Sequence, residues 1–196
     1  MTSPVSAPTP RPDSPLAPLR FAVVLVVVFG LLYPLVVTLL GGALFPSQAN
    51  GSLITRNGAV VGSSLIGQTF SGARYFIGRP SAAGAGYDPT SASGSNLAPS
   101  NPDLKKRVQA DAATIARREG VPGSQIPVDL VTASGSGLDP DISPEGAALQ
   151  VRRVAQARGL TEAQVRAAVE RHTNRSPLGP ARVNVLALNL DLDGAK

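Results

Sequence analysis

The chain has 196 residues, with 18 Lys and Arg against 13 Asp and Glu, which gives a formal net charge of +5. It holds no Cys and one His, and this excludes a disulfide framework, a thiolate nucleophile and a multi-histidine metal site within one chain. The basic clusters at 105–107, 117–118 and 152–153 fall on expected helices without interleaved aromatic residues, so we expect a solvated face and no nucleic-acid partner.

The first 20 residues are rich in proline, with Ser, Thr and Ala between the prolines. Such a segment cannot bury an apolar core, so residues 1–20 are expected to form a disordered tail.

An uncharged apolar run follows at residues 21–45, FAVVLVVVFGLLYPLVVTLLGGALF. Its length exceeds the roughly 18–20 apolar residues that mark a membrane span. The alternative is a cleaved signal peptide with Ser47-Gln48-Ala49 as its site, but the apolar region of a signal peptide is usually about 7–15 residues long. We therefore expect one uncleaved helix that crosses the inner (plasma) membrane once.

The positive charges beside this span predict its orientation. Arg11 and Arg20 precede the span closely, whereas the first positive charge after it is Arg56. By the positive-inside rule, the N-terminal tail should lie in the cytoplasm and residues 46–196 outside it.

Small residues recur along one side of the expected helix. Gly30, Pro34, Thr38 and Gly41 fall within an arc of roughly 80° at about 100° per residue. The ring of Pro34 would press on the carbonyl of Gly30, which predicts a kink and a freed carbonyl. Two interpretations stay open: Gly and Pro are common in membrane helices, or the stripe is a face that docks onto a partner helix.

The remaining residues, 46–196, are long enough for one compact domain. Asn57-Gly58 predicts a hairpin over residues 53–61, and another short extended piece follows up to residue 70. Residues 81–100 form a long loop without periodicity, which is typical of a disordered or functional segment. Strands are expected at 127–132 and 182–192, where Leu186, Leu188, Leu190 and Leu192 alternate with other residues.

Three helices carry clear start and stop signals. The N-caps are Asn101, Ser143 and Thr161, with Gln164 completing a capping box at the third and Leu160 packing on Val165 as a hydrophobic staple. Glycines at 120 and 159 close the first two helices. The side chains expected to point inward are Leu104, Val108, Ile115, Ala147, Val151, Val154 and Ala155. Together with the strands, the pattern predicts an α+β domain on a single membrane anchor.

Few residues carry a signal for catalysis. His172 should cap the third helix, and a triad of Ser134, His172 and Asp139 lacks the G-x-S-x-G pattern that would support it. Asp139 and Asp141 could be paired carboxylates, but Asp139-Pro140 and Ser143-Pro144 are also ordinary turn and cap chemistry, and we favour the structural interpretation. The run Ser134-Gly135-Ser136-Gly137 offers backbone amides that can hold a phosphate, but it lacks a Walker sequence, so a plain strand-to-helix turn is the stronger interpretation.

Several ordered stretches resemble the C subunit of the Kdp-type potassium-transporting ATPase of bacteria and archaea. They are FPSQANGSLI at 45–54, SSLIGQTF at 63–70, YFIGRPSA at 75–82, SGSNLAPSNPDL at 93–104, PVDLVTASGSGLDPDISPEGAALQVRRVAQARGLT at 127–161 and RVNVLALNLDLD at 182–193. The family often has Asn or His in place of Asp141, and SGGSN where the chain has SGSN at 93–96.

The resemblance implies an accessory subunit and not an enzyme. In this family a channel-like subunit carries potassium, a P-type ATPase subunit hydrolyses ATP, and the C subunit helps to assemble and stabilise the complex. The family is also described as a catalytic chaperone that raises the ATP affinity of the pump subunit. The suggested nucleotide contacts would match Ser134, Gly135, Ser136, Gly137 and Gln150.

The predicted orientation conflicts with this nucleotide role, because a domain outside the cytoplasm meets no ATP. We therefore expect no cofactor of the chain's own, with ATP acting through the complex, and a domain that caps the channel entrance and holds the two large subunits together. We expect Phe76 to fill the core, and Tyr75 and Arg79 to bind a partner subunit. A membrane-anchored extracytoplasmic hydrolase built on Ser134 and His172 is the alternative function.

Overall fold

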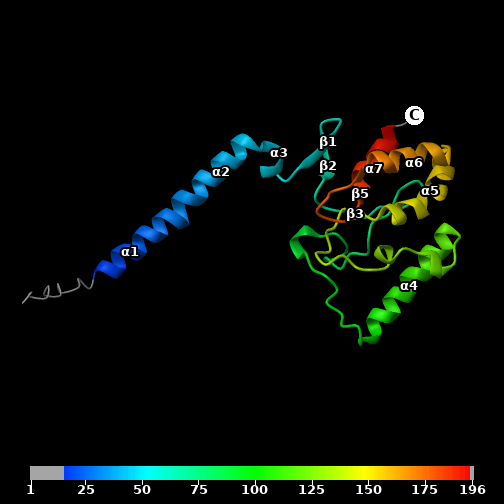
Figure 1. The fold of residues 1–196 in the computed structure, drawn as a ribbon, viewed down its shortest axis with the longest axis horizontal. Coiled ribbons are helices and arrows are strands. Elements are labelled where there is room, and N and C mark those ends of the chain that lie inside the picture. Colours follow the sequence, from blue (N-terminus) through cyan, green and yellow to red (C-terminus); the bar gives the residue numbers. More distant parts are fainter. Residues whose placement is uncertain (1–15, 195–196) are drawn as a thin grey trace, which may run out of the picture. The chain divides into compact units, whose positions relative to one another are not determined.

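The computed structural model describes residues 16–194, which divide into two units between Asn50 and Gly51 (Figure 1). The prolines at 4–15 and Arg11 lie outside the described residues. The first unit is a helix followed by one short helical turn, α3 (Pro46–Ala49). The second is a domain of helices and small antiparallel sheets. The α+β prediction is confirmed.

One continuous helix, Ala17–Leu44, makes up most of the first unit. It has 28 residues and a mean hydropathy of 2.8, so its length and composition suit a membrane crossing. The helix begins four residues before the apolar run and therefore includes Arg20. Its segments are α1 (Ala17–Leu25), η1 (Val26–Leu32) and α2 (Tyr33–Leu44).

The distortion expected at Pro34 takes the form of a π-helical stretch, η1, that contains Gly30. The N–H of Tyr33 donates to the carbonyl of Val28, five residues back. In a regular α-helix the ring of Pro34 would meet the carbonyl of Gly30, and a wider turn moves that carbonyl away from the ring. The proline therefore explains why the helix widens on its N-terminal side.

The domain starts with the predicted hairpin, β1 (Leu53–Arg56) and β2 (Ala59–Ser63). Asn57 and Gly58 both have positive φ values, 53° and 78°, as a two-residue type I′ turn requires. A Cβ on Gly62 would lie 2.8 Å from Leu186 Cδ2, so one face of the hairpin packs closely on the last helix. The extended piece expected after the hairpin forms only an isolated bridge between Ser63 and Ile66.

A second sheet is short and antiparallel, with the strand order β3–β5–β4. Its strands are β3 (Asp141–Ile142), β4 (Thr173–Asn174) and β5 (Arg182–Asn184). Ile142 pairs with Val183, and both side chains are buried in the core.

The three predicted helices and their caps are confirmed. They are α4 (Pro102–Glu119), α5 (Pro144–Arg158) and α6 (Glu162–Arg171). Asn101, Ser143 and Thr161 each accept a backbone N–H at the helix start, Gln164 completes the capping box, and Gly120 and Gly159 adopt the left-handed conformation at the ends. Along α4 only Ile115 is fully buried, so the expectation that Leu104 and Val108 point into the core is only partly met.

One predicted strand is wrong, and a second is correct only over its first three residues. Residues 127–132 contain a 3₁₀ turn, η4 (Val128–Leu130), and the strand at 182 ends at Asn184, where α7 (Val185–Gly194) begins. The alternating leucines suggested a period of two, but the buried set follows helical spacing: Val185, Leu186, Leu188, Asn189 and Leu192. Asn184 Oδ1 accepts the N–H of Ala187, which is N-cap chemistry that the leucine pattern concealed.

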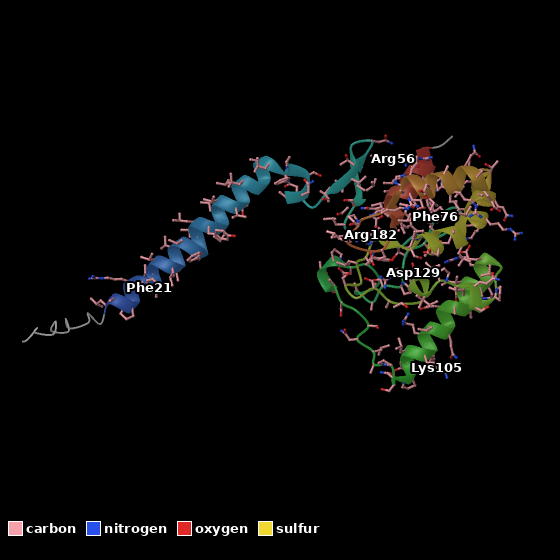
Figure 2. All side chains as sticks on the ribbon, in the orientation of Figure 1. Phe21, Arg56, Phe76, Lys105, Asp129 and Arg182 are labelled. Atoms are coloured by element: carbon pink, nitrogen blue, oxygen red, sulfur yellow. The ribbon has the colours of Figure 1, made fainter. Side chains whose placement is uncertain are left out.

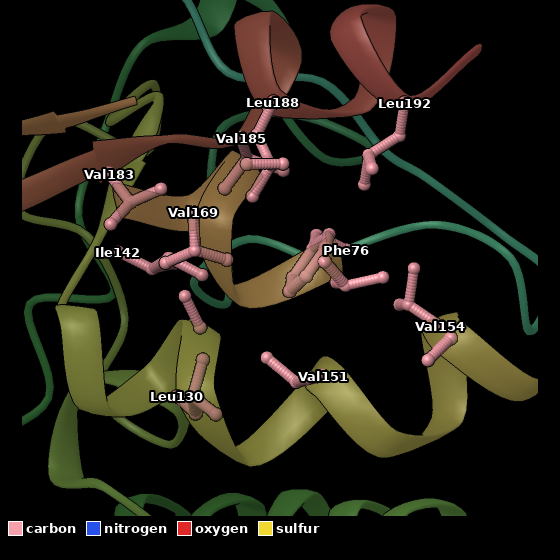
Figure 3. Packing of buried hydrophobic residues seen from close by; sticks show 14 of the residues in the cluster. Phe76, Leu130, Ile142, Val151, Val154, Val169, Val183, Val185, Leu188 and Leu192 are labelled. Carbon is pink, nitrogen blue, oxygen red and sulfur yellow. The ribbon is translucent and has the colours of Figure 1, made fainter. Parts of the chain in front are cut away.

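Phe76 lies at the centre of the core, between α5 and α7 (Figure 3). Val151 and Val154 of α5 face it from one side, and Val185, Leu188 and Leu192 lie on the other. The prediction that Phe76 fills the core is confirmed, since its side chain is completely buried. Figure 2 places Phe76 in the interior of the domain and Lys105 at the outer end of α4.

The long loop at 81–100 contains only the short turn η2 (Pro89–Ser91), yet it is fixed in place. Ser81 Oγ donates to the carbonyl of Gly137 and accepts the N–H groups of Ala83 and Tyr87. The Tyr87 hydroxyl donates to the carbonyl of Arg79 at 2.5 Å, and burial raises the pKa of this hydroxyl to about 12. A second connecting turn, η3 (Gly123–Gln125), follows α4.

Candidate functional site

The Ser-Gly run, residues 134–137, forms a tight turn that is stabilised by its own oxygens. Ser134 is buried, and its Oγ accepts the N–H groups of Gly137 and Asp139 at 3.0 and 3.3 Å. Ser136 Oγ accepts the N–H of Leu138 and lies 3.2 Å from Ser134 Oγ. The N–H of Ser134 donates to the carbonyl of Pro80. Two of the four backbone donors that suggested a phosphate cradle, those of Ser134 and Gly137, are therefore engaged inside the fold.

The glycines of this turn serve close packing against the loop at 81–100. A Cβ on Gly137 would lie 2.5 Å from the carbonyl oxygen of Ser93 and 2.6 Å from Ala83 Cβ, and Gly137 has a φ of 73°. A Cβ on Gly94 would lie 2.8 Å from the carbonyl oxygen of Gly135. Two Ser-Gly segments that are far apart in the sequence thus touch backbone to backbone, which only glycine allows.

An open groove of about 740 Å³ borders the turn. The groove carries side chains of both signs of charge. Its lining includes Ser134, Gly135, Ser136, Asp139, Asp141, His172, Asn174, Arg182 and Asn184. The structure thus brings together Ser134, His172 and Asp139, which the sequence had suggested only as a weak triad.

The three residues share the groove, but they do not form a catalytic triad. His172 Nε2 lies 3.2 Å from Asp191 Oδ2, and the His172 N–H caps the end of α6 by donating to the carbonyl of Ala168. Ser134 Oγ already accepts two backbone N–H groups, and no hydrogen bond joins it to His172 among the described residues. The prediction that His172 is a capping residue is confirmed.

The acidic residues of this region have shifted pKa values of opposite sign. Burial, together with the charge of Asp139, raises the pKa of Asp141, while Arg182 and a hydrogen bond from Asn184 oppose the shift. The hydrogen bond from Arg171 and the contact with His172 lower the pKa of Asp191. Asp139 itself binds Arg79 Nη1 at 2.7 Å and accepts the N–H of Asp141.

Gln150 lies away from the groove, fully buried on α5. Its Oε1 accepts the N–H of Ile77 and a guanidinium hydrogen of Arg153, and its Nε2 donates to the carbonyls of Ile77 and Gly146. These four bonds use the whole hydrogen-bonding capacity of the amide. The structure therefore does not bring Gln150 together with the Ser-Gly turn, and a nucleotide contact would require Gln150 to break a bond.

Side chains to which the sequence analysis gave no such role form a clamp around the backbone of residues 73–77. Asn189 is buried on α7, accepts the N–H of Phe76 at 2.8 Å and donates to its carbonyl at 2.9 Å. Arg153 donates to the carbonyls of Ala73 and Tyr75, and Arg158 donates to that of Arg74. This segment belongs to no sheet, so side chains take the place of a partner strand. The one sequence signal for these side chains is that each is a polar residue among the apolar residues of a helix.

The basic clusters are not uniformly solvated, which corrects part of the sequence prediction. Arg153 and Arg118 both pair with Glu119, whose side chain is fully buried. Arg107 pairs with Asp111 at 2.7 Å on α4. Pairing with a carboxylate offsets the cost of removing each guanidinium from water. Lys105, Lys106, Arg117 and Arg152 are exposed, as expected.

Tyr75 and Arg79, the two residues predicted to bind a partner, are half-buried and engaged within the chain. Tyr75 packs on Phe70, with ring centroids 5.6 Å apart, and the guanidinium of Arg158 lies 5.4 Å from its ring centroid. Arg79 binds Asp139 at the rim of the groove. A contact with a partner stays a prediction for both residues.

The small residues of the membrane helix make few contacts within their own chain. A Cβ on Gly30 would meet only Val26 Cγ1, at 3.8 Å, and one on Gly41 or Gly42 would meet no described atom within 4 Å. The π-helical turns shift the rotation between Gly30 and Pro34, so the predicted arc applies most directly from Pro34 through Thr38 to Gly41. Packing within the described chain does not explain why these positions are small.

Comparison with known proteins supports one family. The family model of the K+-transporting ATPase c chain, KdpC, matches residues 16–194. The potassium-transporting ATPase KdpC subunit of Acidobacterium capsulatum is 54% identical over 176 residues, covering 88% of this chain and 94% of that protein. The KdpC subunit of Sorangium cellulosum is 54% identical over 191 residues, covering 92% and 100%. That of Xanthomonas oryzae pv. oryzae is 55% identical over 169 residues, covering 85% and 80%.

The matched residues include both the membrane helix and the domain, as the resemblance had implied. The chain therefore belongs to the KdpC family, the c chain of K+-transporting ATPases.

Proposed function

We propose that the chain is an accessory subunit of an ATP-driven potassium pump, which assembles and stabilises the channel-like and P-type ATPase subunits. The observation that carries the proposal is the family match over residues 16–194. The geometry agrees with it, because Ser134, Gly137 and Gln150, three of the candidate catalytic or nucleotide-binding residues, are hydrogen-bonded inside the fold. The exposed small-residue face of the membrane helix, by contrast, has no partner among the described residues.

Docking of this face onto a membrane helix of the partner subunits can be tested with two adjacent glycines. Gly41 lies within the stripe, whereas Gly42 is rotated by about 100°. A Cβ at either position would meet no described atom of this chain, so each tolerates a larger side chain within its own fold. Gly41→Leu should weaken co-purification of the complex, and Gly42→Leu should have a smaller effect. Equal recovery of the complex with both variants would rule out the docking face.

The orientation is part of the same proposal, with the N-terminus in the cytoplasm and the domain outside. Because the chain has no Cys, a single Leu178→Cys variant gives a clean reporter at a side chain that is 96% exposed. A membrane-impermeant thiol reagent should label it in intact cells. Labelling only after lysis would show that the domain lies in the cytoplasm, which contradicts the proposed orientation.

A catalytic-chaperone role, in which the chain raises the ATP affinity of the pump subunit, is compatible with an indirect route through subunit contacts. The saturated hydrogen bonding of Gln150 supports that route over direct nucleotide contact. Equilibrium binding of labelled ATP to the full chain alone, compared with the assembled complex, separates the two. Saturable binding to the chain alone would favour direct contact.

A further inference from the structure

The domain holds another pocket, which shares no lining residue with the groove beside the Ser-Gly turn. This α4 pocket has a volume of about 320 Å³, and its lining comes from α4, from residues 68–81 and 86–87, and from Leu130. Sites for small molecules have volumes of about 300–1,000 Å³. All of the lining belongs to one unit of the chain. Its apolar part consists of Phe70, Ile77, Pro80, Ile115 and Leu130.

Part of the lining is fixed by Tyr87, whose backbone is strained. Its φ of 56° is unfavourable for a bulky side chain. The Tyr87 N–H donates to Ser81 Oγ, and its hydroxyl donates to the carbonyl of Arg79. A Cβ on Gly78 would lie 2.6 Å from the Tyr87 hydroxyl oxygen, so glycine makes room for this side chain. The α4 pocket therefore has a preformed wall, as sites for small molecules usually do.

Arg118 is the charged residue of the lining that has hydrogen-bonding capacity left over. Its side chain is 25% exposed, and its Nε donates to Glu119 Oε1 at 2.6 Å. Its two terminal nitrogens have no hydrogen-bond partner among the described residues. Glu119 is also bound by Arg153, whose Nε lies 3.0 Å from each of the carboxylate oxygens. One buried carboxylate thus serves two guanidinium groups, and a net positive charge remains.

The other charged side chains of the lining have partners of their own. Arg79 binds Asp139 at 2.7 Å, and Asp111 binds Arg107 at 2.7 Å. The lining therefore combines an apolar surface with one guanidinium that is only partly neutralised. A guanidinium binds a carboxylate through two parallel N–H···O bonds, so a carboxylate suits the terminal nitrogens of Arg118. A phosphate would bring a second negative charge into a pocket that already contains Asp111, which favours a monoanion.

We propose that the α4 pocket binds a small molecule with an apolar body and a single carboxylate. The body packs on Phe70, Ile77 and Ile115, where its removal from water stabilises the complex. The carboxylate accepts N–H groups from the terminal nitrogens of Arg118. The site lies apart from the Ser-Gly turn, so it adds a ligand to the accessory subunit and assigns no catalysis to it.

The test measures binding of labelled phenylbutyrate to the full chain in detergent by equilibrium dialysis, with empty micelles as the blank. Phenylbutyramide is the matched ligand, because it has the same apolar body and no charge. We expect saturable binding of the acid. Binding of the amide should be about tenfold weaker, since hydrogen bonds to a charged group are stronger than those between neutral groups.

Two pairs of substitutions on α4 locate the site. Arg118→Met should weaken binding of the acid about tenfold and leave binding of the amide unchanged. Arg117→Met, at an exposed position outside the lining, should have no effect. Thr114→Trp should block the pocket, whereas Ala113→Trp should not, because Thr114 belongs to the lining and Ala113 does not. Both are exposed, so this pair stays informative if the loss of Arg118 disturbs Glu119.

Three results would each overturn the proposal: no saturable binding, equal binding of the acid and the amide, or equal binding by the two tryptophan variants. Loss of binding when the chain assembles with its partner subunits would overturn it as well, because a side chain of a partner would then fill the pocket. None of these results changes co-purification of the complex. Failure of this proposal is therefore distinct from failure of the proposed accessory role.

Discussion

Two irregular segments of the domain stabilise their backbones in contrasting ways. The backbone of residues 73–77 is bound by side chains from distant helices, with Asn189 lying 113 residues from Phe76. The Ser-Gly turn at 134–137 is stabilised by its own hydroxyls and by glycines that admit a neighbouring backbone. The first arrangement depends on tertiary contacts, and the second combines local hydroxyl bonds with close packing on the loop at 81–100. A polar or glycine-rich segment can therefore be structural even when its composition suggests a ligand site.

The largest effect should follow from removing the clamp on Phe76. Asn189→Leu leaves the buried N–H and carbonyl of Phe76 without partners. Because each buried unsatisfied group costs about 1–3 kcal/mol, the free energy of unfolding should fall by about 2–5 kcal/mol. Urea unfolding of the full chain in detergent, followed by circular dichroism, measures the change.

The matched control for this variant is Asn174→Leu, at an exposed position in β4. We expect a change within about 0.5 kcal/mol. A similar loss of unfolding free energy in both variants would show that the bonds of Asn189 to Phe76 do not account for the effect.

Next in size is the packing of the Ser-Gly turn. In Gly137→Ala the new Cβ meets the Ser93 carbonyl and the residue keeps a positive φ, so a loss of about 2–4 kcal/mol is expected. Gly135→Ala is the control, since a Cβ there meets no described atom within 4 Å. Thermal unfolding of the two variants under the same conditions measures the difference. Equally small losses of stability in the two variants would contradict the close backbone contact. The turn would then again be a candidate ligand site.

The smallest effect concerns the groove beside that turn. Because burial raises the pKa of Asp141 in the folded state, ionisation of this carboxyl costs stability at pH values above its folded pKa. Asp141→Asn should therefore raise the free energy of unfolding at pH 7. The gain should be less than about 1 kcal/mol, because the group is partly solvated. The gain should shrink as the pH falls below the folded pKa and disappear below the ordinary, unfolded-state pKa, where the carboxyl is protonated in both states. Unfolding midpoints over this pH range test the sign, and a loss of stability at pH 7 would refute it.

Much of the fold was predictable because its signals are local. The caps Asn101, Ser143 and Thr161 and the Asn57-Gly58 turn bond within a few residues, so their sequence context sufficed. The helix α7 was missed because its alternating leucines suggested a strand, although Asn184 supplies an N-cap. Within the candidate site, the sequence correctly predicted His172 as a cap but gave no sign of its contact with Asp191.

The sequence by itself determined the apolar span, the α+β class, the three capped helices and the family, since all of these depend on composition, short-range spacing and ordered motifs. Only the tertiary structure decided that Gln150 and Asn189 bind the backbone of Phe76 and Ile77, and that the loop at 93–94 packs on the Ser-Gly turn. The physical reason is that a buried backbone group must find a hydrogen-bond partner wherever the fold places one. That partner can lie more than a hundred residues away along the chain.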